Sequence, residues 1–137
     1  MIIVDASAIV KLVVKEENSS KAIAEIEGAI NRGEVIVSAD IALAETLSAI
    51  WKHHKILKDI SLNELNDKID VALLIWDRIV KIDTRPLAHK AMEVALANNL
   101  TTYDSLYVAA CKANNAPLLT FDDGIINRAD ELDIQLL

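Results

Sequence analysis

The sequence predicts an α/β fold in which helices cover both faces of a short-stranded, mainly parallel sheet. Short runs rich in β-branched residues alternate along the chain with longer segments whose apolar residues recur at helical spacing. That alternation is typical of β-α-β units, which place parallel strands in one sheet beneath covering helices. Only three Gly and two Pro occur in 137 residues, which argues against an all-β fold with many tight turns.

Strands are expected where three to five mainly apolar residues lie between polar segments. The runs that meet this description are 2–4, 35–37, 79–82 and 117–121, with 134–137 as a candidate final strand. In open α/β sheets, ligands bind beyond the carboxyl ends of the strands. The residues that directly follow these runs are therefore the first candidates for a functional site.

Helices are expected between the strands, where apolar residues recur every three or four positions and polar residues stand at the start. Asp40 and Ser61 are placed to cap two of them, and Pro86 suits the first turn of another. The expected helices span about 6–14, 19–31, 40–54, 61–78, 86–98, 101–114 and 123–131.

The composition indicates one globular domain over residues 1–137. Hydrophobic residues make up 53% of the chain, so it can bury a core and is not expected to be disordered. No apolar run approaches the ~18–20 residues of a membrane span, and the N-terminus lacks the basic start of a signal peptide. The single cysteine, Cys111, excludes an internal disulfide and favours the reducing cytoplasm.

The chain is acidic, with a formal net charge of −7. That charge has the wrong sign for a protein that binds nucleic acid through Lys and Arg alone. Two interpretations stay open at this point. Either the partner is not a nucleic acid, or cations mediate the contact and basic residues are grouped locally.

Asp5, Glu45 and Asp104 each stand alone in an otherwise uncharged stretch, and Asp122 ends the uncharged run 113–121. Burying an ionised carboxylate is unfavourable unless the group is paired or coordinates a metal. Taken singly, Asp5 and Asp122 are explained as helix N-caps, and Asp104 as a first-turn acid. Glu45 falls in the middle of its expected helix, with no Lys or Arg three or four residues away.

Taken together, the four acids indicate a site for a hard divalent cation. Asp5 and Asp122 follow expected strands, and clustered carboxylates stay ionised around ions such as Mg²⁺ or Mn²⁺. Ser7 and Thr120 lie two residues from Asp5 and Asp122, where their hydroxyls would orient a carboxylate. Local capping explains each of these hydroxyls equally well.

Four segments of the chain resemble one known family in its motif order. They are VDASAIVKL (4–12), the AE pair at 44–45, TTYDSLYVAACK (101–112) and LLTFDD (118–123). They resemble the PIN-domain family, and more narrowly the small VapC-type toxins of prokaryotic toxin–antitoxin pairs. Two positions depart from the family pattern: Ser105 stands where Ala is commoner, and Asp123 doubles the final acid.

The resemblance implies a three-layer α/β/α sandwich and a metal-dependent endoribonuclease that acts on RNA in the cytoplasm. It implies that Asp5, Glu45, Asp104 and Asp122 hold Mg²⁺ or Mn²⁺ and carry the hydrolysis. Because the acid is doubled, either Asp122 or Asp123 is the fourth ligand, and the spacing from Thr120 favours Asp122. The resemblance also implies a homodimer and a cognate antitoxin that restrains the enzyme. A PIN-like module that binds protein or RNA without cleaving it is the alternative.

Three lysines are candidate contacts for the RNA backbone. Lys11 and Lys15 share one side of the first helix, and Lys52 opens the basic group KHHK (52–55). A solvated helix surface explains each of them as well. The aromatic residues of the helices are interpreted as core or subunit contacts; these are Trp51, Trp76, Tyr103 and Tyr107.

Overall fold

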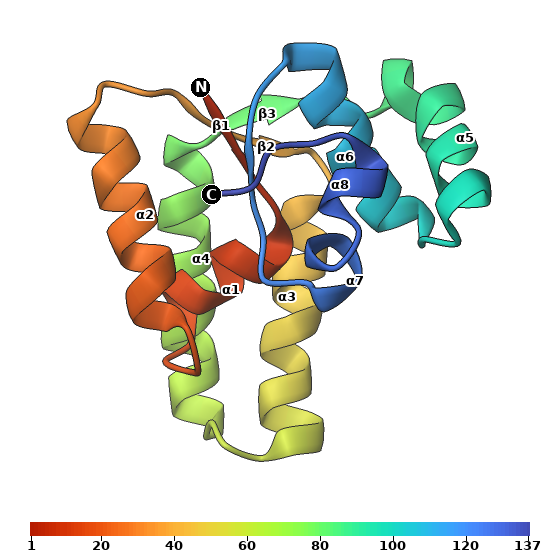
Figure 1. Ribbon diagram of the computed structural model, residues 1–137. Coiled ribbons are helices and arrows are strands. Elements are labelled where there is room, and N and C mark those ends of the chain that lie inside the picture. Colours follow the sequence, from red (N-terminus) through yellow and green to blue (C-terminus); the bar gives the residue numbers. More distant parts are fainter.

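A four-stranded parallel sheet lies between two layers of helices in the computed structural model, which describes residues 1–137 (Figure 1). The strands are β1 (Ile2–Val4), β2 (Ile36–Ala39), β3 (Val80–Ile82) and β4 (Leu118–Leu119). In Figure 1, α2 and α4 lie on one side of these strands, and α5 and α6 lie on the other. The predicted α/β/α arrangement around a short-stranded parallel sheet is therefore confirmed.

The helices follow the expected order along the chain. They are α1 (Ala6–Val13), α2 (Ser19–Asn31), α3 (Ala42–Lys52), α4 (Leu62–Arg78), α5 (Ala88–Asn98), α6 (Thr102–Asn114), α7 (Asp123–Ile126) and α8 (Ala129–Leu132). A π-helical segment, η1 (His53–Leu57), extends α3, and a 3-10 turn, η2 (Arg85–Leu87), precedes α5. No helix combines the length and the apolar character needed to cross a bilayer.

The order of the strands in the sheet is β3-β2-β1-β4, with every pairing parallel. The chain moves from β1 to β2 to β3 in one direction and then returns to place β4 on the free edge of β1. The order of the strands thus reverses between β1 and β4. Open α/β sheets bind ligands at the carboxyl ends of the strands beside such a reversal.

Strands β1 and β4 are buried on both faces because helices cover both faces of the sheet. Ile2, Ile3, Leu118 and Leu119 have no exposed surface, and Val4 is only 1% exposed. Full burial of side chains of this size contributes roughly 1.5–3 kcal/mol each. This apolar sheet is the rigid base on which the residues after β1 and β4 stand.

The start of α3 differs from the prediction. Ile41, rather than Asp40, is the residue before the helix, and the Asp40 carboxylate instead accepts a 2.7 Å hydrogen bond from the Thr84 hydroxyl. Glu45 consequently stands in the first turn of α3 and not in the middle of a helix. The prediction for α4 holds, because Ser61 and Glu64 form a reciprocal capping box at its start.

The C-terminal segment also differs from the prediction. The helix expected over 123–131 is divided into α7 and α8, because Arg128 between them leaves the helical conformation. The expected strand 134–137 is reduced to one isolated parallel bridge between Leu118 and Leu136. Asp133, three residues before this bridge, has a positive φ of 52° and ends α8.

Candidate active site

Asp5 directly follows β1, and its side chain is almost completely enclosed. Its Oδ1 atom accepts hydrogen bonds from the Ser7 hydroxyl at 2.6 Å and from the Ala8 amide at 2.9 Å. Its Oδ2 atom accepts a 2.5 Å hydrogen bond from the Thr120 hydroxyl, which follows β4. Asp5 is thus the N-cap of α1, which confirms the explanation of this residue as a helix cap. Its hydrogen bond to Thr120 also joins the ends of two neighbouring strands.

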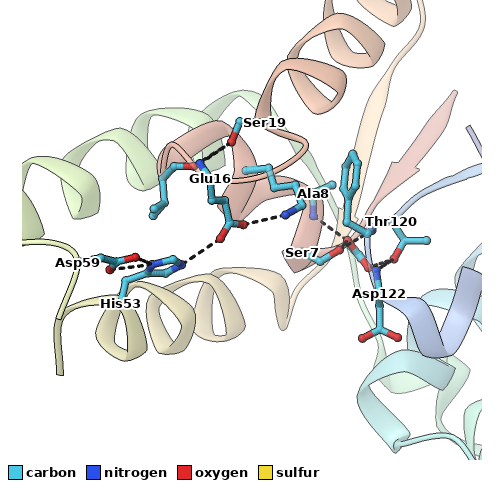
Figure 2. A network of polar contacts seen from close by, with 12 residues as sticks. Ser7, Ala8, Glu16, Ser19, His53, Asp59, Thr120 and Asp122 are labelled. Atoms are coloured by element: carbon cyan, nitrogen blue, oxygen red, sulfur yellow. Dashed lines mark hydrogen bonds and ion pairs between the residues drawn. The ribbon is translucent and has the colours of Figure 1, made fainter. Parts of the chain in front are cut away.

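The segments after β1 and β4 are held together by a second set of hydrogen bonds (Figure 2). The Phe121 amide donates to the Ser7 hydroxyl at 2.8 Å, and the Asp122 amide donates to the Thr120 hydroxyl at 3.1 Å. Asp122 Oδ1 in turn accepts a 3.1 Å hydrogen bond from the Ile125 amide and caps α7. Both hydroxyls therefore orient the loop that carries Asp122.

Glu45 is held from across the molecule by a tyrosine. Its Oε2 atom accepts a 2.6 Å hydrogen bond from the Tyr107 hydroxyl, so α6 and α3 are linked at this point. Tyr107 is only 2% exposed, and burial together with the Glu45 charge raises the pKa of its hydroxyl. The hydroxyl therefore stays protonated and serves as the donor.

Asp104 lies in the first turn of α6 beside the residue that caps this helix. Its amide donates to the Thr101 hydroxyl at 3.2 Å, and that hydroxyl donates to Asp104 Oδ2 at 2.6 Å. The acid is thus anchored at the helix N-terminus, where a negative charge is favourable. The first-turn explanation of Asp104 holds, and it leaves Oδ1 free.

The four carboxylates influence one another electrostatically. Burial raises the pKa of Asp5 to about 6 against the lowering effect of its three hydrogen bonds, and the Asp122 charge adds to the rise. Burial likewise raises the pKa of Glu45, with smaller contributions from the charges of Asp5 and Asp104. Burial and the Asp122 charge raise the pKa of Asp104. The charge of each of the four acids thus affects, or is affected by, that of at least one other.

None of these four acids takes part in any of the seven ion pairs of the chain. Both oxygens of Asp5 are held by the chain. The other three acids each have one oxygen held, and Glu45 Oε1, Asp104 Oδ1 and Asp122 Oδ2 accept no hydrogen bond. As the side chains stand, no three acidic, imidazole or thiol groups form a group that could hold a metal ion. The donor set is suited to a hard cation, and the free oxygens would have to draw together around it.

The adjacent acids Asp122 and Asp123 lie in two different environments. Asp122 is half-buried, and its charge raises the pKa of both Asp5 and Asp104. Asp123 is exposed in the first turn of α7. This geometry favours Asp122 as the member of the acidic site, in agreement with its spacing from Thr120.

The three candidate lysines are placed very differently. Lys11 forms a 2.9 Å ion pair with Glu16, and its ammonium lies 5.3 Å from the centre of the Phe121 ring. Lys15 is exposed but lies two residues beyond the end of α1, so the expectation that it shares one side of the first helix with Lys11 is wrong. Lys52 is exposed at the end of α3, on the wall of a groove that contains Glu45. Lys11 is thus already paired within the chain, whereas Lys15 and Lys52 are open to a ligand.

An ion-pair network extends from Lys11 away from the acids (Figure 2). Glu16 contacts His53 Nε2 at 3.2 Å, and Asp59 contacts His53 Nδ1 at 2.9 Å. His53 is buried, so this network connects the end of α3 to the segment after α1. These contacts give His53 a structural role.

The sequence does not predict the role of Tyr107, which is interpreted from its pattern as a core or subunit contact. The side chain is indeed buried, but it also holds Glu45. One signal was present, because Asp104 and Tyr107 are three residues apart and so share one side of α6. Two of the other aromatic residues do not belong to the core, since Tyr103 is 57% exposed and Trp51 is 51% exposed.

The fold and the acids after its strands define the class of protein. The PIN-domain family profile matches residues 2–132, and the chain belongs to this family. It is 30% identical over 127 residues to Ribonuclease VapC3 of Pyrobaculum aerophilum, covering 88% of this chain and 88% of that protein. The resemblance found in the four sequence motifs is therefore confirmed.

Two solved structures share the fold. The crystal structure of PAE2754 from Pyrobaculum aerophilum has a TM-score of 0.69 and 20% identity, covering 92% of this chain and 84% of that one. The crystal structure of VapBC2 from Rickettsia felis, bound to a DNA fragment from their promoter, has a TM-score of 0.70 and 19% identity. It covers 100% of this chain and 98% of that one. At these identities, the likeness shows the arrangement of the elements.

Proposed function

We propose that this protein is a metal-dependent endoribonuclease and the toxin of a toxin–antitoxin pair. It hydrolyses RNA phosphodiester bonds at Asp5, Glu45, Asp104 and Asp122. The observation that carries the proposal is a set of four neighbouring carboxylates without a cationic partner, at the carboxyl edge of a PIN-domain sheet. The relative of this chain that is named a ribonuclease supports the same activity.

The donor chemistry of the site fits Mg²⁺ or Mn²⁺. All four candidate ligands are carboxylate oxygens, and three of them present an oxygen that the chain leaves free. A bound ion of this kind would activate water and stabilise the negative charge of the phosphate under attack. It would also offset the repulsion between RNA and a chain of net charge −7.

The surrounding hydroxyls have positioning roles in this proposal. Ser7 and Thr120 hold Asp5 and lower its pKa against the effect of burial, so that it is mainly ionised at neutral pH. The Tyr107 hydroxyl holds Glu45 and the Thr101 hydroxyl holds Asp104, and each lowers the pKa of its acid against the effect of burial. Each of these three acids is thereby restricted in the orientation that its carboxylate can adopt.

Cleavage of labelled RNA in Mn²⁺ and in EDTA tests the proposal. Wild-type protein is expected to cut only with the metal, and Asp104→Asn to lose most of that cleavage. Asp123→Asn, which neutralises an exposed acid beside the site, is the matched control and should cut normally. The alternative is a non-catalytic PIN-like module, which would bind RNA and leave it intact under every condition.

The proposed partner is a cognate antitoxin whose peptide brings an Arg to the acidic pocket. A guanidinium stays charged and pairs with a carboxylate through two hydrogen bonds. The affinity of such a peptide should fall when Asp104 or Asp122 is changed to Asn. Unchanged affinity in both variants would show that the partner does not contact the acids.

We further propose that the protein acts as a homodimer in the cytoplasm, with Lys15 and Lys52 as contacts to RNA. Several large apolar side chains outside the core are exposed, which favours association of two copies. Lys11 is less available than Lys15 or Lys52 to contact RNA, because its ammonium is paired with Glu16. The single cysteine, Cys111, is buried and free, in keeping with a reducing compartment.

A further inference from the structure

A groove opens directly beside the acidic site, between α3 and the first turn of α6. Its volume is about 610 Å³. Glu45 forms part of its wall, and Ala44, Ser48, Lys52 and Tyr103 are among the other residues that line it. The small side chains of Ala44 and Ser48 leave room along α3. The groove therefore continues from one of the proposed metal ligands over the surface of the protein.

Tyr103 gives the groove an exposed aromatic face. Tyr103 directly precedes Asp104, and its side chain is 57% exposed, whereas Tyr107 on the same helix is buried. An exposed aromatic ring contributes little to the core. Proteins bind single-stranded RNA by stacking unpaired bases on rings of this kind.

Lys52 gives the same groove a free positive charge. It is exposed and belongs to none of the ion pairs of the chain. Glu45 and Lys52 are seven residues apart on continuous helix, so they lie on one side of α3 about 10 Å apart along its axis. A ligand that reaches from the acids to Lys52 would thus meet a cation roughly two helical turns away.

We propose that this groove binds a nucleotide of single-stranded RNA next to the phosphodiester that is cut. The base stacks on Tyr103 and a neighbouring phosphate pairs with Lys52. The order of groups along the groove matches this ligand, since the carboxylates serve the scissile phosphate and a cation serves the next part of the backbone. The inference rests on the proposed ribonuclease function and assigns a substrate subsite to it.

Binding of a labelled pool of random single-stranded RNAs of about 12 nucleotides tests the inference. The affinity is measured by fluorescence anisotropy in Mn²⁺, with every variant made in an Asp5→Asn background to prevent cleavage. Tyr103→Ala and Tyr103→Leu should bind about tenfold more weakly, because one base–aromatic stack is lost. Tyr103→Phe keeps the ring and should bind normally. Trp51→Ala removes a ring of similar exposure, 51%, from outside the groove and should have no effect.

Lys52 is tested by the salt dependence of the same binding. Lys52→Gln should make the slope of log affinity against log salt less steep by about 0.7, the value for one phosphate contact on a single strand. Lys112→Gln, at the other end of α6 from Tyr103, is the matched control and should leave the slope unchanged.

The possible results separate this inference from the proposed function. If wild-type protein cuts the pool but Tyr103→Ala binds as tightly as its parent, the subsite is wrong and the ribonuclease stands. Retained binding in Tyr103→Leu with loss in Tyr103→Ala would indicate apolar docking, as for a peptide, and would overturn the nucleotide assignment. Absence of binding by the Asp5→Asn parent would also overturn it. Absence of any cleavage by wild-type protein in Mn²⁺ would remove the ribonuclease proposal itself.

Discussion

The Tyr107 hydroxyl on α6 donates a 2.6 Å hydrogen bond to Glu45 Oε2 on α3, across 62 positions of the chain. This contact lowers the pKa of Glu45, while burial and the charges of Asp5 and Asp104 raise it. Tyr107 therefore acts through Glu45 and is a positioning residue for the proposed site. The contact also fixes α6 against the start of α3, where the acid stands.

Tyr107→Phe should fold, because the ring fills the same buried space and one hydrogen bond contributes only about 0.5–1.5 kcal/mol net. Without its donor, Glu45 should have a higher pKa. The acidic limb of the pH–rate profile for RNA cleavage is then expected to move to higher pH. A profile that keeps its position would show that Tyr107 serves the core alone.

Asp5→Asn should abolish most cleavage without loss of stability. Asn is close in shape to Asp, can accept from Ser7 and Ala8, and no longer carries a charge that is unfavourable when buried. Thermal unfolding in EDTA at neutral pH is expected to give a melting temperature equal to or above that of wild-type protein. A clear fall would mean that the ionised Asp5 is a structural group, and its proposed role as a metal ligand would lose support.

The stability gap between these two proteins should depend on pH in a defined direction. The pKa of Asp5 is about 6 in the folded protein and 3.8 in its reference state, so the folded state binds the proton more tightly. Its stabilising contribution is complete below pH 4 and is lost as the pH rises through 6. By pH 7, Asp5→Asn should therefore have gained about 3 kcal/mol in free energy of unfolding relative to wild type. Denaturant unfolding from pH 4 to 7.5 in EDTA measures the gap, and a gap of opposite slope contradicts the assignment.

Asp122 and Asp123 provide a matched test of the metal site. Mg²⁺ or Mn²⁺ should raise the melting temperature of wild-type protein by several degrees, because an ion that binds only the folded state stabilises it by mass action. Asp122→Asn should lose much of that rise and Asp123→Asn should keep it, since only Asp122 interacts with Asp5 and Asp104. Asn is a good N-cap, so α7 should survive in the Asp122→Asn variant. Equal shifts in both variants would place the ion elsewhere.

The proposed homodimer can be tested directly by measuring the mass of the protein in solution. Light scattering at micromolar concentration should give twice the 15.0 kDa of one chain. The physical reason is the number of large apolar side chains left on the surface, among them Ile56, Leu57, Leu62 and Leu96. A mass of one chain would contradict the proposal for the protein on its own.

Much of the fold was predictable because it depends on local patterns. Short β-branched runs and helical spacing of apolar residues located all four strands and the main helices. The errors fall where tertiary contacts compete with local preference. Asp40 has the residue type of an N-cap, but the Thr84 hydroxyl, 44 positions away, is its partner instead. The end of α3 continues as the π-helical segment η1, which no periodicity of apolar residues indicates.

The sequence by itself determined which acids stand apart from cationic partners, and that Asp5 and Asp122 follow strands. It did so because strand ends and isolated charges are properties of neighbouring residues. Only the tertiary structure decided that β4 lies beside β1, which lets Thr120 reach Asp5 and brings Asp122 to the same edge. It also decided that Tyr107 serves Glu45, and that Tyr103 and Lys52 line one groove. These relationships depend on how α3 and α6 pack over the sheet, and that packing is set by contacts between residues far apart in the chain.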